Sequence, residues 1–248
     1  MSGVLVIGGT AEARALAAAL HACDVPVVSS LAGRVSNPAL PEGEVRIGGF
    51  GGVDGLVDHL RAAGYDAVVD ATHPFAARMS AHAATACEVA GVPLLRLQRP
   101  GWGGHRDAER WHWVRDIDDA RRSAESLGDR AFLTTGRQTL DAFRSWTDRY
   151  TLVRLVEEPS WPAPTSWEVL RSRGPYSLDS ERELLRSRGI DVLVTKDSGG
   201  SMTEAKLQAA GELDIPVVVV RRPPVPEGVM AVDSVDDAVA WTVTLLRS

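Results

Sequence analysis

Cysteine is scarce in this chain, with two among 248 residues. Cys23 and Cys87 each lie in an apolar, helix-like stretch. Neither belongs to a C-x-x-C pair or to a His/Cys cluster with the spacing of zinc ligands. We therefore predict neither a disulfide framework nor a bound metal.

Long hydrophobic runs and a charged leader are also absent. No apolar run approaches the ~20 residues of a membrane span, and the first three residues lead directly into a β-branched run. Basic residues are in the minority, 27 Lys and Arg against 33 Asp and Glu, which argues against a general binder of nucleic acid or anionic membranes. The prediction is a soluble cytoplasmic protein.

Several enzyme signatures are missing as well. The patterns G-x-S-x-G, H-E-x-x-H and G-x-x-x-x-G-K-[ST] do not occur, and neither does the protein-kinase motif set. Hydrolase, kinase and Walker-type ATPase functions are therefore without support.

What the sequence does contain is an alternation of short β-branched runs with Ala-, Leu-, Glu- and Arg-rich segments, typical of parallel strands covered by helices on both faces. The predicted strands are Val4–Ile7, Val25–Ser29, Glu44–Ile47, Ala67–Asp70, Pro93–Leu97, Ala131–Thr135, Thr151–Val156, Asp191–Thr195 and Pro216–Val220. The predicted helices are Glu12–Ala22, Val53–Ala63, Ala76–Ala90, Asp118–Leu127, Thr139–Thr147, Asp179–Arg188, Met202–Gly211 and Ser234–Leu246. The fold class is α/β.

An internal sequence repeat indicates two similar units. The segment from Asp66 to Pro100 and the segment from Asp191 to Pro223 each run from a strand through a helix to a second hydrophobic run that ends in Arg-Pro. Proline and three glycines interrupt the pattern at Pro100–Gly104. We predict two Rossmann-like domains, residues 1–100 and 101–248, with a ligand cleft between them. Ligands should bind beyond the carboxyl ends of the strands.

The first domain carries the signals of a nucleotide site. Gly8-Gly9-Thr10-Ala11-Glu12 forms a glycine turn between the first strand and a helix, which suits phosphate, although it is not G-x-G-x-x-G and an ordinary βα turn is the alternative. The second strand ends in Ser29, Ser30 and then Arg34 rather than in a carboxylate, which favours NADP over NAD. Gly49, Thr72 and His73 follow the next two strands; a flexible turn and a turn histidine are the alternatives there.

The second domain carries two turns that suit an anionic ligand. Gly136-Arg137 ends one strand, and Lys196-Asp197-Ser198-Gly199-Gly200 ends another before a helix that bears Lys206. Cations gather at strand ends generally, which indicates a substrate with several carboxylates or phosphates, although solvated strand ends are the alternative. These cations are Arg96, Arg99, Arg137, Lys196, Arg221 and Arg222.

Five motifs in order extend this interpretation across nearly the whole chain. They are Gly8-Gly9-Thr10 with Glu12, Ser30–Arg34, Asp70–Ala76, Gly174–Ser177 and Thr195–Gly200. Together they resemble the precorrin-6A reductase family of cobalamin biosynthesis. The resemblance implies reduction of one macrocycle double bond by NADPH, giving precorrin-6B. It also implies a tetrapyrrole substrate rich in acetate and propionate groups, with neighbouring pathway enzymes as further partners.

With that resemblance, the site residues divide by domain. The residues assigned to the cofactor are Gly8, Gly9, Thr10, Ala11, Glu12, Ser29, Ser30, Arg34, Gly49, Thr72 and His73. Those assigned to the substrate are Gly136, Arg137, Lys196, Asp197, Ser198, Gly199, Gly200 and Lys206. Hydride addition to an iminium-like C=N unit needs little acid, so a dedicated proton donor need not exist. If one does, His73 and Tyr176 are the candidates.

Two alternatives remain open at this point. Another NADP-dependent reductase of a polyanionic small molecule would share the first domain without needing the Lys196–Gly200 turn. A nucleotide-sensing module would share both domains and show no turnover, but no partner-binding tail or low-complexity segment supports it.

Overall fold

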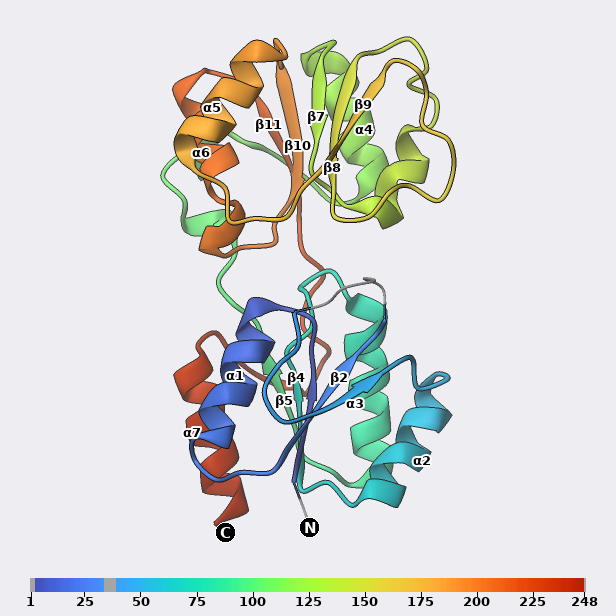
Figure 1. Ribbon diagram of the computed structural model, residues 1–248, viewed down its shortest axis with the longest axis vertical. Helices are drawn as coiled ribbons and strands as arrows, with labels where there is room; N and C mark the ends of the chain where they lie inside the picture. The colour runs from blue at the N-terminus through green and yellow to red at the C-terminus, as the bar shows by residue number, and fades with distance from the viewer. Residues whose placement is uncertain (1–2, 34–38, 248) are drawn as a thin grey trace. The chain divides into compact units, whose positions relative to one another are not determined.

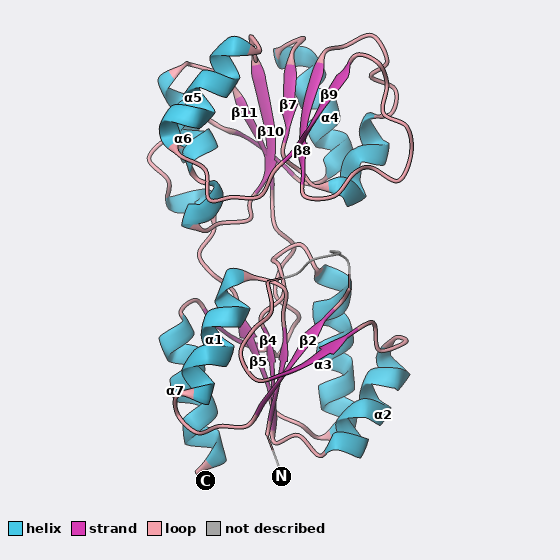
Figure 2. Cartoon of the chain, viewed as in Figure 1, coloured by secondary structure: helices cyan, strands magenta, loops and turns pink. Residues whose placement is uncertain are grey.

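The computed structural model describes residues 3–33 and 39–247 of the chain. It forms two compact units: residues 1–100 together with 223–248, and residues 101–222. Each unit contains one six-stranded sheet in which all neighbouring strands are parallel. Figure 2 shows helices on both faces of each sheet.

The sheet of unit 1 has the order β12-β5-β4-β1-β2-β3. Its strands are β1 (Val4–Ile7), β2 (Val27–Leu31), β3 (Glu44–Ile47), β4 (Ala67–Asp70), β5 (Leu94–Leu97) and β12 (Met230–Val232). Its helices are α1 (Ala11–His21), α2 (Val53–Ala63), α3 (Ala77–Ala90) and α7 (Val235–Leu246). Helices α1 and α7 cover one face, and α2 and α3 cover the other (Figure 1).

The sheet of unit 2 has the order β6-β11-β10-β7-β8-β9. Its strands are β6 (His112–Val114), β7 (Ala131–Leu133), β8 (Thr151–Leu155), β9 (Trp167–Arg171), β10 (Val192–Lys196) and β11 (Val217–Val220). Its α-helices are α4 (Ile117–Leu127), α5 (Leu178–Ser187) and α6 (Ala205–Glu212). Short 3-10 helices are η1 (Trp102–Gly104), η2 (Ala108–Arg110), η3 (Arg137–Phe143) and η4 (Ser201–Thr203).

The central strands form where the sequence is continuously apolar. Residues 4–7 and 217–220 are buried along their whole length, as expected for parallel strands covered on both faces. Helix α1 begins at Thr10, whose side chain accepts a hydrogen bond from the Ala13 N–H. The predicted α/β fold with two parallel sheets is confirmed.

Three strands were missed by the sequence analysis, and each lies at the edge of a sheet. β6, β9 and β12 have partly exposed side chains, because an edge strand needs no continuous hydrophobic run. The helix predicted over Thr139–Thr147 was also wrong: the 3-10 helix η3 occupies Arg137–Phe143.

The predicted division at residue 100 coincides with a boundary between the units, but the predicted extent of the second domain differs from the structure. Residues 223–248 belong to unit 1, where β12 pairs with β5 and α7 packs beside α1. The chain therefore passes between the units twice, once after Pro100 and once after Arg222.

Candidate functional site

Each sheet has one point where the strand order reverses, and several of the predicted site residues lie on the loops that follow the strands at this point. In unit 1 the reversal falls between β1 and β4, and in unit 2 between β7 and β10. Loops at the carboxyl ends of such strand pairs diverge to opposite faces and leave room for a ligand. The turns at Gly8–Glu12 and Asp70–His73 meet at the first point. Those at Thr134–Arg137 and Lys196–Gly200 meet at the second.

The turn after β1 has the form of an anion cradle. Gly9 adopts φ +112°, and nothing lies within 4 Å of the position a Cβ would take. Thr10 Oγ1 accepts from the Ala13 N–H (3.0 Å) and donates to the Ala71 carbonyl (2.8 Å), which ties the start of α1 to the end of β4. The N–H groups of Ala11 and Glu12 are first-turn donors that have no partner within a helix. This geometry suits a phosphate group.

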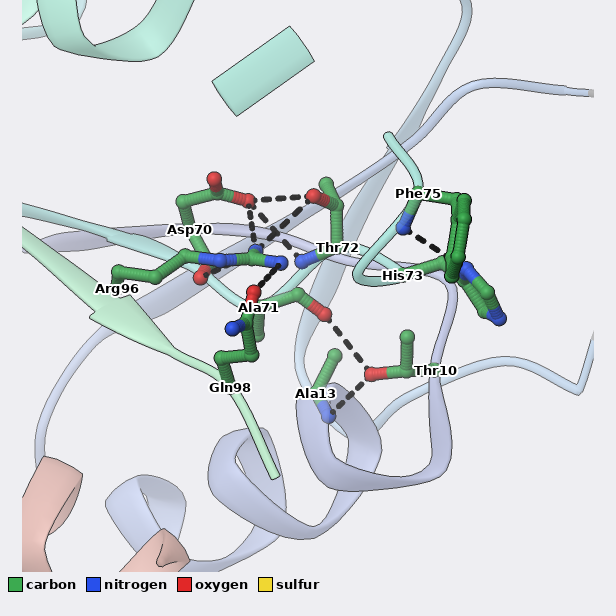
Figure 3. A network of polar contacts seen from close by, with 9 residues as sticks. All are labelled: Thr10, Ala13, Asp70, Ala71, Thr72, His73, Phe75, Arg96 and Gln98. Atoms are coloured by element: carbon green, nitrogen blue, oxygen red, sulfur yellow. Dashed lines mark hydrogen bonds and ion pairs between the residues drawn. The ribbon is translucent and has the colours of Figure 1, made fainter. Parts of the chain in front are cut away.

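A buried ion pair supports the end of β4 (Figure 3). Arg96 Nη1 lies 2.9 Å from Asp70 Oδ1, and both side chains are 2% exposed. Asp70 Oδ1 also accepts from the backbone N–H of Thr72 (3.0 Å) and from its hydroxyl (2.7 Å). Arg96 donates further to Thr72 Oγ1 and to Gln98 Oε1. Thr72, predicted to contact cofactor, is thus held by this network.

The Asp70–Arg96 pair was not predicted from the sequence. Arg96 was expected among the cations at the ligand edge, whereas its guanidinium is buried inside the unit. The available signal was a complementary pair of charges on β4 and β5, but the two residues become partners only through the register of those strands, in which Asp70 is opposite Arg96.

The remaining residues predicted for the cofactor have varied surroundings. Glu12 Oε2 lies 2.6 Å from Arg99 Nη1, so the carboxylate is already paired. Ser30 Oγ accepts from Arg46 Nη1 (2.9 Å), and the Gly49 carbonyl accepts from Arg46 Nη2 (3.2 Å). Ser29 is 2% exposed and its Oγ has no hydrogen-bond partner among the described residues. Arg34 lies outside the described residues.

His73 is exposed at the loop that follows β4. Its Nδ1 accepts a hydrogen bond from the Phe75 N–H (3.2 Å), so the proton of the neutral ring resides on Nε2 (Figure 3). The imidazole can therefore donate from Nε2.

In unit 2, β10 ends in a partly buried lysine, Lys196. Burial lowers the pKa of the Lys196 ammonium from 10.5 to about 8. Arg137 is exposed at the end of the neighbouring turn, directly after Gly136. Two cations thus stand on turns at the carboxyl ends of adjacent strands, with the N–H groups of a glycine-rich turn nearby.

Asp197 serves the structure of this turn. Its Oδ1 accepts from the Trp102 N–H (2.6 Å), and Arg222 Nε donates to its Oδ2 (3.1 Å). Trp102 and Arg222 stand at the beginning and the end of unit 2. We expected this carboxylate to face substrate. In the structure it accepts hydrogen bonds from the two segments through which the chain enters and leaves the unit.

Lys206 is buried beneath the same loop rather than displayed on it. It is 4% exposed, and its Nζ donates to the Thr203 carbonyl (2.7 Å). Burial, followed by the positive charge of Arg154, lowers its pKa to about 7, while the Glu181 carboxylate raises it. In this structure the Lys206 ammonium holds the Thr203 carbonyl, and its contact with substrate stays a prediction.

Arg154 and Glu181 form a second buried pair close by. Arg154 Nη1 and Nη2 each donate to one oxygen of Glu181, at 2.8 and 2.7 Å. The ring of Tyr176, a candidate proton donor, lies 4.0 Å from the Arg154 guanidinium carbon, and its hydroxyl is 3.3 Å from Ser172 Oγ. This network joins β8, α5 and the loop between β9 and α5.

The described part of the chain contains neither a metal-ligand cluster nor a membrane-spanning helix. No three His, Cys, Asp or Glu side chains gather there closely enough to hold a metal ion. None of the helices in residues 3–33 and 39–247 has the length and apolar character required to cross a membrane.

Comparison with known proteins gives the family of this chain. The family model described as precorrin-6x reductase CbiJ/CobK matches residues 3–243. Precorrin-6A reductase of Rhodococcus erythropolis is 51% identical, covering 100% of both chains. That of Mycobacterium tuberculosis strain H37Rv is 52% identical over 99% of each. A solved structure of CobK precorrin-6A reductase superposes with a TM-score of 0.91 at 39% identity, covering 99% of this chain and 97% of that one. This chain therefore belongs to the precorrin-6x reductase CbiJ/CobK family.

Proposed function

We propose that this protein reduces precorrin-6A with NADPH as a step of cobalamin biosynthesis. The observation that carries the proposal is the end-to-end identity of 51% with a precorrin-6A reductase, which leaves no domain of either chain unmatched. Each sheet also has one strand-order reversal, the place where ligands of open α/β sheets bind, and this supports the proposal of one ligand for each unit.

The degree of identity favours the metal-free macrocycle. The relatives with 51% and 52% identity are named precorrin-6A reductase, whereas those named cobalt-precorrin-6A reductase, from Salmonella typhimurium and Priestia megaterium, are 32% and 29% identical. We therefore assign precorrin-6A without cobalt as the substrate.

Unit 1 is assigned to NADPH, which supplies the hydride when bound. Gly8, Gly9 and Thr10 form the turn whose open backbone and helix N-terminus suit the pyrophosphate. The Asp70–Arg96 pair holds Thr72 and the start of the His73 loop in place beside this turn. Rigid support of this kind is what a positioned cofactor needs.

Unit 2 is assigned to the tetrapyrrole carboxylates. Lys196 and Arg137 supply positive charge, and Ser198, Gly199 and Gly200 supply a turn with backbone donors. Asp197 and Lys206 act indirectly in this assignment: the first fixes the turn to Trp102 and Arg222, and the second fixes the carbonyl of Thr203.

The chain's own part in proton transfer is small. Because a positive nitrogen in the substrate accepts the electron pair, hydride addition to a C=N unit requires no strong acid. Of the two candidate donors, His73 is exposed and can donate from Nε2, while the Tyr176 ring is stacked on Arg154. We therefore place His73 ahead of Tyr176.

The test is a coupled spectrophotometric assay. Purified protein is mixed with precorrin-6A and NADPH, and both NADPH oxidation and the absorbance of the macrocycle are followed, with NADH and cobalt-precorrin-6A as comparisons. Turnover of precorrin-6A with NADPH, faster than in either comparison, is expected. NADPH binding without turnover would favour another NADP-dependent reductase or a nucleotide-sensing module. Absence of NADPH binding would contradict the cofactor assignment.

A further inference from the structure

Arg46 has no role in the assignments above, yet it lies where a dinucleotide-binding sheet recognises the adenosine ribose. β2 and β3 are parallel neighbours, and their register places Ser30 opposite Arg46. At the end of the second strand of such sheets, a carboxylate selects the 2′-hydroxyl of NAD, whereas a nearby arginine accommodates the 2′-phosphate of NADP. β2 ends in Ser29, Ser30 and Leu31, none of which is acidic.

The guanidinium of Arg46 is held in one orientation. Nη1 donates to Ser30 Oγ (2.9 Å) and to the Gly48 carbonyl (3.0 Å), and Nη2 donates to the Gly49 carbonyl (3.2 Å). Its central carbon lies 3.9 Å from the centroid of the Phe50 ring. These three acceptors are neutral oxygens, so they fix the guanidinium without cancelling its charge. A pre-oriented planar cation is well suited to phosphate.

Ser30 adds a donor at the same place. A serine hydroxyl has one proton to donate and two lone pairs that accept. Because Ser30 Oγ accepts from Arg46, its own proton remains to be directed to another acceptor. Arg46 and Ser30 thus combine a positive charge with a hydroxyl donor at the end of β2, which is the chemistry that a phosphate monoester requires.

We propose that Arg46, together with the Ser30 hydroxyl, binds the 2′-phosphate of NADPH and sets the preference for NADPH over NADH. This inference rests on the proposed function, since it concerns the cofactor of that reaction. The competing explanation is that Arg46 only fixes the turn at Gly48–Phe50. The two explanations differ in one respect: a turn-fixing arginine would affect NADPH and NADH alike.

The experiment compares both cofactors in the wild type and in the variants Arg46→Ala, Arg46→Lys and Ser30→Ala. Arg61→Ala is the matched control, because Arg61 is an exposed arginine of the same unit whose Nη2 donates to the Val89 carbonyl. KM and kcat are measured with NADPH and with NADH. Adenosine 2′,5′-bisphosphate and 5′-AMP are titrated into each protein by calorimetry, which requires no turnover.

Arg46→Ala should raise KM for NADPH by about tenfold or more, the loss of one charge-assisted contact, and leave kcat and the KM for NADH nearly unchanged. Binding of the 2′,5′-bisphosphate should weaken in parallel while that of 5′-AMP does not change. Arg46→Lys should retain part of the preference, Ser30→Ala should lose part of it, and Arg61→Ala should match the wild type.

Equal losses for NADPH and NADH, or an unchanged ratio between them, would overturn the assignment of Arg46. If Arg46→Ala does not fold, the same criteria apply to Arg46→Lys and Ser30→Ala. A wild type that binds the 2′,5′-bisphosphate no better than 5′-AMP would also overturn it. Failure of the proposed function looks different: the wild type would bind the 2′,5′-bisphosphate through Arg46 but would not oxidise NADPH with precorrin-6A.

Discussion

Lys196 combines a positive charge with partial burial, so the proposed assignment of this residue to the substrate predicts that substrate binding depends on pH. Its pKa is lowered to about 8, so the ammonium loses its proton as the pH rises through that value. We predict that the wild-type KM for the tetrapyrrole increases above about pH 8. Lys196→Ala should raise KM by roughly tenfold at pH 7 and flatten this increase, because the charged contact is gone. Initial rates between pH 6.5 and 9.5, at saturating NADPH, measure both effects.

The control for this prediction is Lys196→Arg, which keeps its charge over the whole range because arginine does not titrate there. Its KM should stay level between pH 7 and 9. A rise in KM for NADPH instead of the tetrapyrrole would contradict the assignment of Lys196 to the substrate.

Lys206 links pH to stability. Its folded-state pKa of about 7 lies far below the ordinary value of 10.5, so between these values unfolding takes up one proton. The free energy of unfolding should therefore rise with pH in this window, by at most about 1.4 kcal/mol per pH unit from this group. Below pH 7, Lys206 should add nothing to the change of this free energy with pH. Lys206→Met should remove this rise up to about pH 8, above which Lys196, with its own lowered pKa of about 8, adds a rise that remains in the variant. Urea unfolding of both proteins at pH 6, 7.5 and 9 measures it, and parallel curves would show that Lys206 does not titrate in this range.

At the level of single residues, the sequence indicated where a site residue lies along the fold better than it indicated whether its side chain is buried. Glycine and hydroxyl residues after a β-branched run mark a strand-end turn, so Gly8–Thr10 and Lys196–Gly200 could be placed from local pattern alone. Burial of Arg96 and Lys206 could not, because burial depends on groups remote in the sequence: Arg96 is paired with Asp70, and the charges of Arg154 and Glu181 act on Lys206.

At the scale of elements, the segment that leads from β5 into unit 2 is fixed by close packing. A Cβ at Gly101 would lie 2.7 Å from Asp197 Oδ1 and 2.8 Å from Arg222 Nη2. Asp197 Oδ1 accepts hydrogen bonds from both Arg222 Nη2 and the Trp102 N–H. We predict that Gly101→Ala lowers the free energy of unfolding by about 1–3 kcal/mol, the usual cost of overpacking. The urea midpoint measures this loss.

Gly103 offers a matched control for that substitution. It lies two residues further along, and nothing stands within 4 Å of the position of its Cβ. Gly103→Ala should therefore leave the urea midpoint close to that of the wild type. Equal effects of the two substitutions would mean that the contacts of Asp197 do not restrict this segment.

The elements that could be predicted are those whose own residues carry a clear pattern. Central strands such as β1 and β11 are continuously apolar, and this run is visible in the sequence. The edge strands β6, β9 and β12 depend on a single neighbouring strand for their hydrogen bonds, and their mixed side chains resemble those of a loop. Their existence follows from the sheet rather than from their own residues.

At the scale of the whole molecule, the two units have the same strand order, and each completes its sheet with a segment from beyond a crossing. After β5 the chain enters unit 2, where β6 takes the outer position beside β11; after β11 it returns to unit 1, where β12 takes the outer position beside β5. The repeat was visible in the sequence. The sequence did not show which unit contains the strand and helix that follow each Arg-Pro. By local pattern, both β6–α4 and β12–α7 are compatible with either sheet.

This exchange predicts the effect of deleting residues 223–248. Removal of β12 and α7 would expose the edge of β5 and the apolar face of α1, against which Ala238 and its neighbours pack. Backbone amides of α1 and β5 should lose protection from hydrogen exchange, whereas those of β7 and β10 keep it, since unit 2 retains all its strands. Truncation after Leu246, which leaves α7 whole, is the control. Protection lost in β7 and β10, with α1 unaffected, would instead place the C-terminal segment in unit 2.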